Sequence, residues 1–315
     1  MDIGINRYDF LTGDCEATLA DHRRVSAFKK AIRAAVRPGD VVAHVGCGAG
    51  LLAMMTVEAG AARVITVVPG TASAEMVRAI VADNGMADRI EVVAGDAATL
   101  DIGQQVDMVI CEMIGSFGPE CGIERAMGAF CARHLKPEGT TIPRTLSTCL
   151  APVAFDGELS GLWWEDSHGF DLSSAGMHLG GGSARYVSPA RPWDQLSAPA
   201  TLETLSFGAA GVERDGDRTA RFTVNQPARL EGFLGWFEAD LGNGIRLSSR
   251  IRQADSSWKL WCWPITRGVP MDEGQVITAG LHDQGQPTNA LGWRLDWVAQ
   301  KAVSPADMST AIAAE

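Results

Sequence analysis

The first half of the chain alternates short apolar runs with stretches of helical periodicity. Four runs have the length and composition of buried strands: 41–45 (VVAHV), 63–68 (RVITVV), 89–93 (RIEVV) and 107–111 (DMVIC). The segments between them, and one before them at 17–36, repeat apolar residues at helical spacing. Strands and helices that alternate at this rhythm predict an α/β domain, in which helices cover both faces of a parallel sheet.

The pattern changes after Pro143, where short alternating stretches follow one another. Segments such as RTARFTVN, LEGFLGWFEADL and WKLWCWPI are separated by glycine, aspartate and proline turns. This pattern predicts an antiparallel β-barrel or β-sandwich over 144–315, after an α/β domain over 1–143. The segment 176–200 is rich in glycine, proline and serine but also carries two aromatic residues. It is either a loose loop or an ordered arm that docks on a partner subunit.

Composition and charge argue against several classes of protein. Apolar residues make up 46% and charged residues 21% of the 315 residues, which is typical of a globular chain. A net charge of −11 argues against nucleic-acid binding, which needs a concentrated basic surface. No apolar run is long enough to span a membrane, and the first residues lack the pattern of a secretion signal. The seven cysteines are scattered without a Cys-x-x-Cys pair, which argues against a disulfide framework and a zinc site. We therefore predict a cytoplasmic protein without metal, membrane or nucleic-acid partner.

A glycine-rich turn joins the first predicted strand to the helix that follows. Its residues are Gly46, Cys47, Gly48, Ala49 and Gly50. Such a turn lets a ligand approach backbone N–H groups and the positive end of a helix. The third glycine comes one residue earlier than in the dinucleotide-binding fingerprint, and this spacing is that of S-adenosylmethionine (SAM) methyltransferases. A purely structural tight turn is the alternative interpretation.

Two further positions bear on nucleoside binding. Asp96 follows the third predicted strand, where its side chain can accept a hydrogen bond from an adenine amino group; alternatively, it caps the next turn. Nucleotide-type sites also place an acid at the end of the second strand, where it holds the ribose hydroxyls. Val68 occupies that place here, and Glu75, in the helix that follows, is the available substitute.

A loop with two carboxylates follows the fourth predicted strand. Ligands of open α/β sheets bind beyond the carboxyl ends of the strands, so Glu112 stands where chemistry is expected. Glu120 returns after a short stretch that contains glycine and proline. Two carboxylates that converge on one pocket suit a planar guanidinium, which donates five N–H bonds in a fixed fork. Alternatively, Glu120 only interacts with the N-terminal dipole of the following helix.

Several motifs, in order along the chain, resemble those of the protein arginine methyltransferases. VGCGAGLL resembles their SAM loop, and CEMIGSFGPE resembles the loop in which two glutamates grip arginine. HLKPEGTTIPRTL is similar to the family's segment that ends in a cis-proline, here Pro143, and WWEDSHGFDLSS is similar to the start of its β-barrel. SSWKLWCWPI, followed by VPMDEGQVI, resembles its Thr-His-Trp loop and the next strands. The resemblance spans about residues 20–298. It implies a Rossmann-like SAM-binding domain, followed by a β-barrel domain with a dimerisation arm.

The resemblance also implies roles for individual residues. Glu112 and Glu120 would clamp the guanidinium and carry the catalysis, and Ser257 and Trp258 would complete the arginine pocket. The residues that would bind SAM are Arg24, at its carboxylate, Gly46, Cys47, Gly48 and Gly50, along its length, and Asp96 and Ala97, beside its adenine. The reaction would convert SAM to S-adenosylhomocysteine and would need no metal.

The chain departs from the family pattern in the strands and loops around this site. Val68 replaces the acid that holds the ribose. His44 replaces the aspartate at the end of the first strand, where we interpret it as a hydrogen-bonded core or pocket-edge residue rather than a catalyst. The loop with the two glutamates is one residue shorter than usual, so Glu124 is a rival of Glu120 as the second carboxylate.

Two more departures concern substrate contacts. Ser257 replaces the loop histidine, which leaves Asp21 without the ionic partner that it commonly has in the family, whereas Trp258 is retained. The Tyr-Phe-x-x-Tyr helix, which helps to cover SAM and to hold protein substrates, is not evident. An appended module, which protein-modifying members usually carry, is not evident either.

These departures favour a small substrate. We predict a SAM-dependent N-methyltransferase, a homodimer, that acts on the guanidinium of free arginine or a close small-molecule analogue in a biosynthetic pathway. One alternative is a methyltransferase of arginine in peptides or proteins. The other is a catalytically silent SAM-binding member that binds a partner protein.

Overall fold

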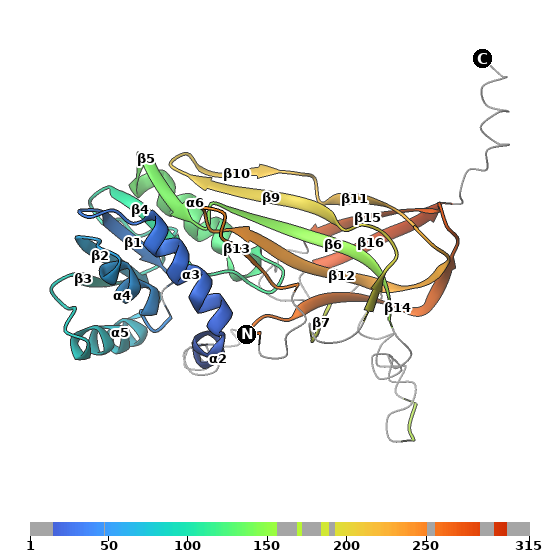
Figure 1. Cartoon of the computed structure of the whole chain (residues 1–315), viewed down its shortest axis with the longest axis horizontal. Helices are drawn as coiled ribbons and strands as arrows, with labels where there is room; N and C mark the ends of the chain where they lie inside the picture. Colours follow the sequence, from blue (N-terminus) through green and yellow to red (C-terminus); the bar gives the residue numbers. More distant parts are fainter. Residues whose placement is uncertain are drawn as a thin grey trace, which may run out of the picture. The chain divides into compact units, whose positions relative to one another are not determined.

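A five-stranded parallel sheet carries the first half of the chain, as a computed structural model shows (Figure 1). The strands lie in the order β3-β2-β1-β4-β5, and each neighbouring pair is parallel. Their bounds are β1 (Val41–Val45), β2 (Arg63–Val68), β3 (Ile90–Ala94), β4 (Val106–Cys111) and β5 (Leu135–Ile142). The helices are α2 (Cys15–Ala20), α3 (His22–Ala35), α4 (Leu51–Glu58), α5 (Thr71–Asp83) and α6 (Ile123–His134), with a short 3₁₀ helix, η2 (Pro119–Cys121). The predicted α/β class with a Rossmann-like sheet is confirmed.

Strand β5 is the element of this sheet that the apolar runs do not predict. Its sequence, LKPEGTTI, mixes lysine, proline and glutamate with only a few apolar residues. It lies at the edge of the sheet, beside β4, where a strand can carry proline and charged side chains. The peptide bond between Ile142 and Pro143, just after β5, is cis, in agreement with the resemblance.

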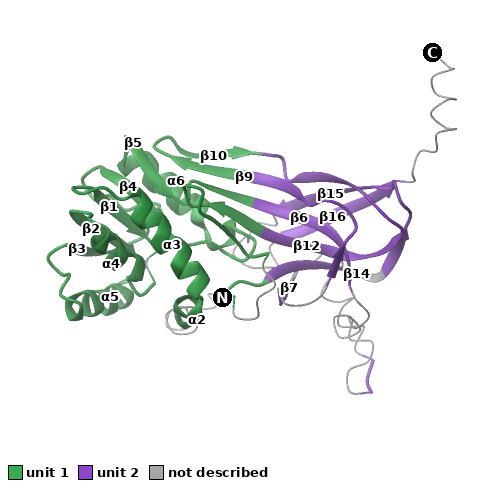
Figure 2. Ribbon diagram, in the orientation of Figure 1, with its two compact units in different colours: residues 1–147, 204–215, 237–259 green, residues 148–203, 216–236, 260–315 purple. Residues whose placement is uncertain are grey.

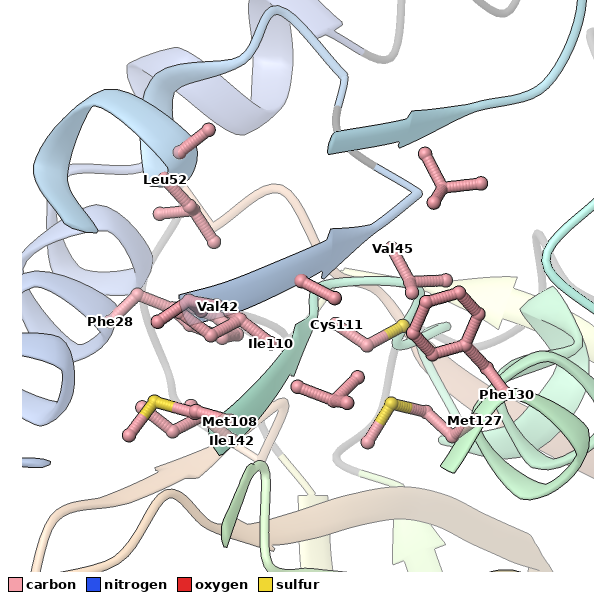
Figure 3. Packing of buried hydrophobic residues seen from close by; sticks show 14 of the residues in the cluster. Phe28, Val42, Val45, Leu52, Met108, Ile110, Cys111, Met127, Phe130 and Ile142 are labelled. Carbon is pink, nitrogen blue, oxygen red and sulfur yellow. The ribbon is translucent and has the colours of Figure 1, made fainter. Parts of the chain in front are cut away.

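The core of the sheet is built from alternate residues of the central strands. Figure 3 shows Phe28 from α3 gathered with Val42 and Ile110, whereas Phe130 from α6 gathers with Cys111. All five side chains are completely buried. Because successive residues of a strand point to opposite faces, each face of the sheet is closed by its own helix.

The strand order places the loops after β1 and β4 side by side. The chain runs outward from β1 to β2 and β3, and then returns to the other side of β1 with β4. In open sheets this reversal is where ligands bind, beyond the carboxyl ends of the strands. The last residues of the two strands, Val45 and Cys111, are partners in the register. Gly46 and Glu112 therefore begin two loops at the same point of the sheet edge.

The second half of the chain is antiparallel. One sheet has eight strands, in the order β10-β9-β6-β12-β14-β7 with β13 on β12 and β8 on β6, and another has three, in the order β11-β15-β16. The bounds are β6 (Thr145–Phe155), β7 (Arg185–Val187), β8 (Trp193–Gln195), β9 (Ala200–Gly208), β10 (Gly211–Asp215), β11 (Thr219–Thr223), β12 (Ala228–Asp240), β13 (Arg246–Ser248), β14 (Leu260–Met271), β15 (Val276–Asp283) and β16 (Trp293–Gln300). The predicted antiparallel β domain is confirmed.

The residues that the structure describes are 15–46, 48–155, 169–171, 184–188, 193–250, 256–283 and 293–300. The chain divides into two compact units, shown in Figure 2. Unit 1 is made of 1–147, 204–215 and 237–259, and unit 2 of 148–203, 216–236 and 260–315. Of the predicted arm, 184–188 and 193–200 are described and include β7 and β8, and the rest lies outside the described residues. The arm's docking, and the functional division after residue 143, stay predictions. No helix in the described part of the chain has both the length and the apolar character to cross a membrane.

Candidate active site

The glycine-rich turn after β1 has the backbone that its sequence predicts. Gly46, Gly48 and Gly50 have φ values of 71°, 48° and 80°, which residues with side chains rarely adopt. At Gly46 a Cβ would also overlap the side chain of Met113, from the loop after β4. Gly50 precedes α4 and offers no side chain to cap the first N–H groups of that helix, which can therefore meet a ligand. The fourth predicted contact of this turn, Cys47, lies outside the described residues.

Arg24 reaches from α3 to the start of the loop after β4. Its Nη2 donates a hydrogen bond of 2.9 Å to the carbonyl oxygen of Glu112 and lies 3.7 Å from Oε2 of the same residue. Its guanidinium carbon lies 4.5 Å from the ring centre of Trp258, in a cation–π contact. Arg24 is 7% exposed, and its Nε has no hydrogen-bond partner among the described residues. The Nε–H of Arg24 thus remains as a hydrogen-bond donor for a ligand.

Glu112 holds its carboxylate largely out of water. Its side chain is 15% exposed, and burial raises the pKa of the carboxyl, although the charge of Arg24 opposes this effect. On the other side, Oε1 lies 3.8 Å from Nε2 of His44, which is completely buried in β1. Glu112 therefore lies between a permanent cation and an imidazole.

Glu120 is held inside its own loop. It is 4% exposed, and its Oε1 accepts a hydrogen bond of 2.7 Å from the N–H of Phe117. Burial raises the pKa of Glu120 to about 7, against hydrogen bonds from several backbone N–H groups of the loop. The carboxylate lies where a Cβ on residue 115 would be, so a side chain at Gly115 would require the carboxylate to move. Oε2 has no hydrogen-bond partner among the described residues and can accept one from a ligand.

Glu124, the rival of Glu120, is engaged elsewhere. It lies in the first turn of α6, is 40% exposed, and both of its carboxylate oxygens accept hydrogen bonds of 2.7 Å from Arg214 in β10. The structure thus places Glu120, and not Glu124, buried in the loop that Glu112 begins.

Asp21 and Ser257 join the start of α3 to the loop before β14. Oδ1 of Asp21 caps α3 by accepting from the N–H of Arg24 at 3.0 Å. Oδ2 accepts from the N–H and the hydroxyl of Ser257, at 3.0 and 2.9 Å. Although burial opposes them, these hydrogen bonds hold the pKa of Asp21 below its usual range. Ser257 thus supplies hydrogen bonds to Asp21, which the sequence comparison left without an ionic partner.

Trp258 connects the same loop to the two-glutamate loop. Its Nε1 donates a hydrogen bond of 3.0 Å to the carbonyl oxygen of Ile114, and its ring packs edge-on against Phe237, with 4.8 Å between ring centres. The indole is almost completely buried. The indole is therefore held in place beneath Arg24, and its hydrogen bond holds the backbone at Ile114, two residues after Glu112.

The chain is similar to known methyltransferases. Residues 42–139 match a methyltransferase domain family. The chain is 28% identical over 274 residues to the arginine N(omega)-methyltransferase of Streptomyces achromogenes subsp. streptozoticus, covering 84% of this chain and 74% of that protein. It is 27% identical to the probable protein arginine N-methyltransferase 6 of Arabidopsis thaliana, covering 71% of this chain but 53% of that protein, so it spans about half of the length of that relative.

The fold is also that of solved arginine methyltransferases. A chain of the Trypanosoma brucei PRMT1 enzyme–prozyme heterotetrameric complex with AdoHcy superposes with a TM-score of 0.77 at 20% identity, covering 93% of this chain and 95% of that one. Arabidopsis thaliana protein arginine methyltransferase 10 superposes with a TM-score of 0.69 at 19% identity, covering 90% and 96%. The chain is thus similar to arginine methyltransferases in sequence and in fold. The part of the chain that carries the parallel sheet matches a methyltransferase domain.

Asp96 stabilises a turn in this protein. Its Oδ1 accepts from the N–H of Ala98 at 3.0 Å, and its Oδ2 accepts from Arg125 of α6 at 2.7 Å. The hydrogen bond from Arg125, followed by that from Ala98, holds the pKa of Asp96 below its usual range. Ala97 is buried beside it. The capping interpretation is therefore observed, whereas the contacts of Asp96 and Ala97 with adenine stay predictions.

The position at which we expect the ribose of SAM is apolar. Val68, the last residue of β2, is 2% exposed. Glu75, the substitute that the sequence offers, is exposed on α5. The described residues contain no group of three or more His, Cys, Asp or Glu side chains that could hold a metal ion.

Two residues beside this site have contacts that the sequence does not reveal. His44 is isolated in an apolar strand, and only the register of the sheet shows that it faces Glu112. Met113 has no polar signal at all, yet its side chain packs on the turn at Gly46. The sequence indicates that these loops meet only in that Gly46 and Glu112 each come directly after a predicted strand.

We expect the replacement of Asp21 by alanine to lower the free energy of unfolding of unit 1 by about 2 kcal/mol near neutral pH, since it removes a helix cap and two further hydrogen bonds. The pKa of Asp21 is lower in the folded than in the unfolded chain. Its contribution is therefore complete above the unfolded pKa of about 3.9 and is lost as the pH falls through the folded value.

Urea unfolding of wild type and variant should thus show a smaller difference near pH 3 than near pH 7. Asp101→Ala is the control, because its exposed carboxylate accepts one backbone hydrogen bond, from Gly103. An equal effect of the Asp21 variant at both pH values would contradict the assignment.

Proposed function

We propose that this chain transfers a methyl group from SAM to the guanidinium of free arginine or of a close small-molecule analogue. The observation that carries the proposal is the pair of buried carboxylates in one loop. Glu120 has an oxygen without a partner among the described residues, and the pKa of each carboxyl is raised by burial. A bound cation with several N–H donors would relieve both conditions, and a guanidinium is such a cation.

The residues of the glycine turn fit SAM. The backbone of Gly46 and Gly50, the uncapped start of α4 and the available Nε of Arg24 together suit a ligand with a backbone-contacting chain and a carboxylate. Arg24 would pair with that carboxylate, and Gly46 to Gly50 would lie along the ligand. When bound, SAM supplies an electrophilic methyl group. Val68 leaves the ribose without an acidic partner from β2.

Glu112 and Glu120 would activate the arginine by position and charge. A guanidinium is a poor nucleophile, because its lone pair is delocalised and its pKa exceeds about 12. Two carboxylates that hold two of its nitrogens concentrate positive charge there and leave the third nitrogen better able to attack. Holding that nitrogen in line with the methyl group can contribute about 7–11 kcal/mol. One of the glutamates, or water, accepts the proton that the product releases.

Several features support a free amino-acid substrate. The loop from Glu112 to Glu120 is one residue shorter than the family pattern, and the Tyr-Phe-x-x-Tyr motif is not evident in the sequence. The similarity to a Streptomyces protein named arginine N(omega)-methyltransferase points the same way. The plant relatives named as protein arginine methyltransferases support peptidyl arginine as the second candidate.

The test of the substrate is a comparison of products. The protein is incubated with SAM and, separately, with free L-arginine or an arginine–glycine-rich peptide, and the products are read by mass spectrometry. We expect a gain of one or more methyl masses on free arginine. Methylation of the peptide alone would reject the small-molecule substrate and favour the second candidate, and no methylation of either would reject the proposed activity.

Glu112→Gln is expected to reduce kcat by at least about a hundredfold, because the amide keeps the shape of the side chain but not the charge that polarises the guanidinium. The affinity for SAM, measured by calorimetry, should change little. Glu124→Gln is the matched control, since Glu124 is paired with Arg214 outside the loop, and it should keep its activity. A Glu112→Gln enzyme within about tenfold of wild type would contradict the assigned role.

The pH dependence of kcat/KM should report Glu120. Its carboxyl must be ionised to hold a guanidinium, and its pKa is raised to about 7. We therefore expect kcat/KM to rise as the pH increases through about 7, with the ionised form active above it, because this parameter titrates the free enzyme. The same limb should remain in Glu124→Gln. A rate that is flat from about pH 6 to 8 would contradict this assignment.

A further inference from the structure

A completely buried imidazole faces the carboxylate of Glu112. His44 lies in β1, the central strand of the sheet, and its Nε2 is 3.8 Å from Oε1 of Glu112. This nitrogen has no hydrogen-bond partner among the described residues. Its other nitrogen, Nδ1, lies 3.4 Å from the hydroxyl of the buried Thr66. A buried N–H without a partner is costly, so its orientation towards a carboxylate calls for an explanation.

The register of the sheet builds this arrangement. His44 of β1 pairs with Thr66 of β2 on one side and with Ile110 of β4 on the other. Residues two apart in a strand share a face, so the chain that continues beyond Ile110 carries Glu112 on the same side of the sheet as His44. Thr66, His44 and Glu112 thus come from three adjacent strands or strand ends.

The imidazole is neutral, and its neighbours select its tautomer. Burial lowers the pKa of His44 to about 3, so the ring carries a single N–H near neutral pH. The Thr66 hydroxyl can donate to Nδ1, which leaves the hydrogen on Nε2, directed at Glu112. A neutral donor stabilises the carboxylate without adding a positive charge that would repel an incoming guanidinium.

We propose that His44 is a positioning residue for Glu112, which rests on the role of Glu112 under the proposed function. Its Nε2–H holds Oε1, while Arg24 lies at Oε2, so that the carboxylate plane is fixed from both sides when arginine binds. In the substrate-free protein both distances exceed a hydrogen bond, and contacts of this kind tighten in the substrate complex. The family's aspartate at this place could not donate such a bond, so the device is particular to a chain with histidine here.

The test compares two variants that disturb the core alike. Gln places an amide N–H near the position of Nε2, whereas Asn reaches only as far as Nδ1. We expect His44→Asn to reduce kcat for arginine by about tenfold or more and to change the KM for SAM by less than about twofold, because only the clamp is disturbed. His44→Gln should stay within about threefold of wild type, since it restores the donor. His134→Gln, at a buried histidine whose nitrogens lie 3.2 Å from carbonyl oxygens of Gln104 and Leu100, controls for the loss of a core histidine.

Two further measurements keep the inference testable if a variant at His44 folds poorly. Thr66→Val keeps the shape of the side chain but removes the hydroxyl that selects the tautomer, and we expect it to reduce kcat by about threefold to tenfold. Binding of arginine by calorimetry, in the presence of S-adenosylhomocysteine, should be weakened by His44→Asn in the wild type but not in a Glu112→Gln background, because the two side chains act together.

The outcomes separate this inference from the function on which it rests. An active wild type with equal losses in His44→Asn and His44→Gln, or with no loss in either, would show that His44 only fills the core. A weakening of arginine binding by His44→Asn that is the same with and without Glu112 would overturn the inference as well. A wild type that methylates neither free arginine nor peptide would overturn the proposed function first.

Discussion

The candidate site of this protein depends on the guanidinium of Arg24. A cation removed from water costs several kcal/mol unless it finds partners. Here the carbonyl and carboxylate of Glu112 and the ring of Trp258 supply them. These partners come from the loop after β4 and the loop before β14, whereas the cation comes from α3. The charge of one side chain thereby draws together segments that lie far apart in the sequence, and 237–259 belongs to the same compact unit as the parallel sheet.

The carboxylates of this unit fall into two kinds. Asp21 has both oxygens occupied by hydrogen bonds, and its pKa is lowered accordingly. Glu112 and Glu120 are buried with too few donors, and their pKa values are raised. The first arrangement stabilises the fold by itself, whereas under the proposed function the second would be completed by a bound cation. Binding of a cation and ionisation of the two glutamates are therefore coupled, which is a requirement of a site that selects a charged group.

The local pattern of residues predicts the frame of this protein but not all of its contacts. Four buried strands and the glycine turn follow from apolar runs and spacing, and Glu112 follows from its place after a strand. Strand β5 escapes because an edge strand needs few apolar residues. The contact of His44 with Glu112 depends on register, and that of Asp21 with Ser257 on tertiary folding, which no short window of sequence contains. Glu120 is buried by its own loop, whereas Glu124 is paired with Arg214 of a strand that lies far away in the sequence.

One glycine sets a limit on how this chain can change during evolution. The carboxylate of Glu120 occupies the space of a Cβ at position 115, so alanine there would displace the carboxylate. The identities of the two residues are thus linked. Once the glutamate has been lost, position 115 can accept a larger residue, but while the glutamate is kept in this position, glycine is favoured there. Among related sequences, a larger residue at this position would indicate that the glutamate side chain lies elsewhere, even in members whose sequence retains the glutamate.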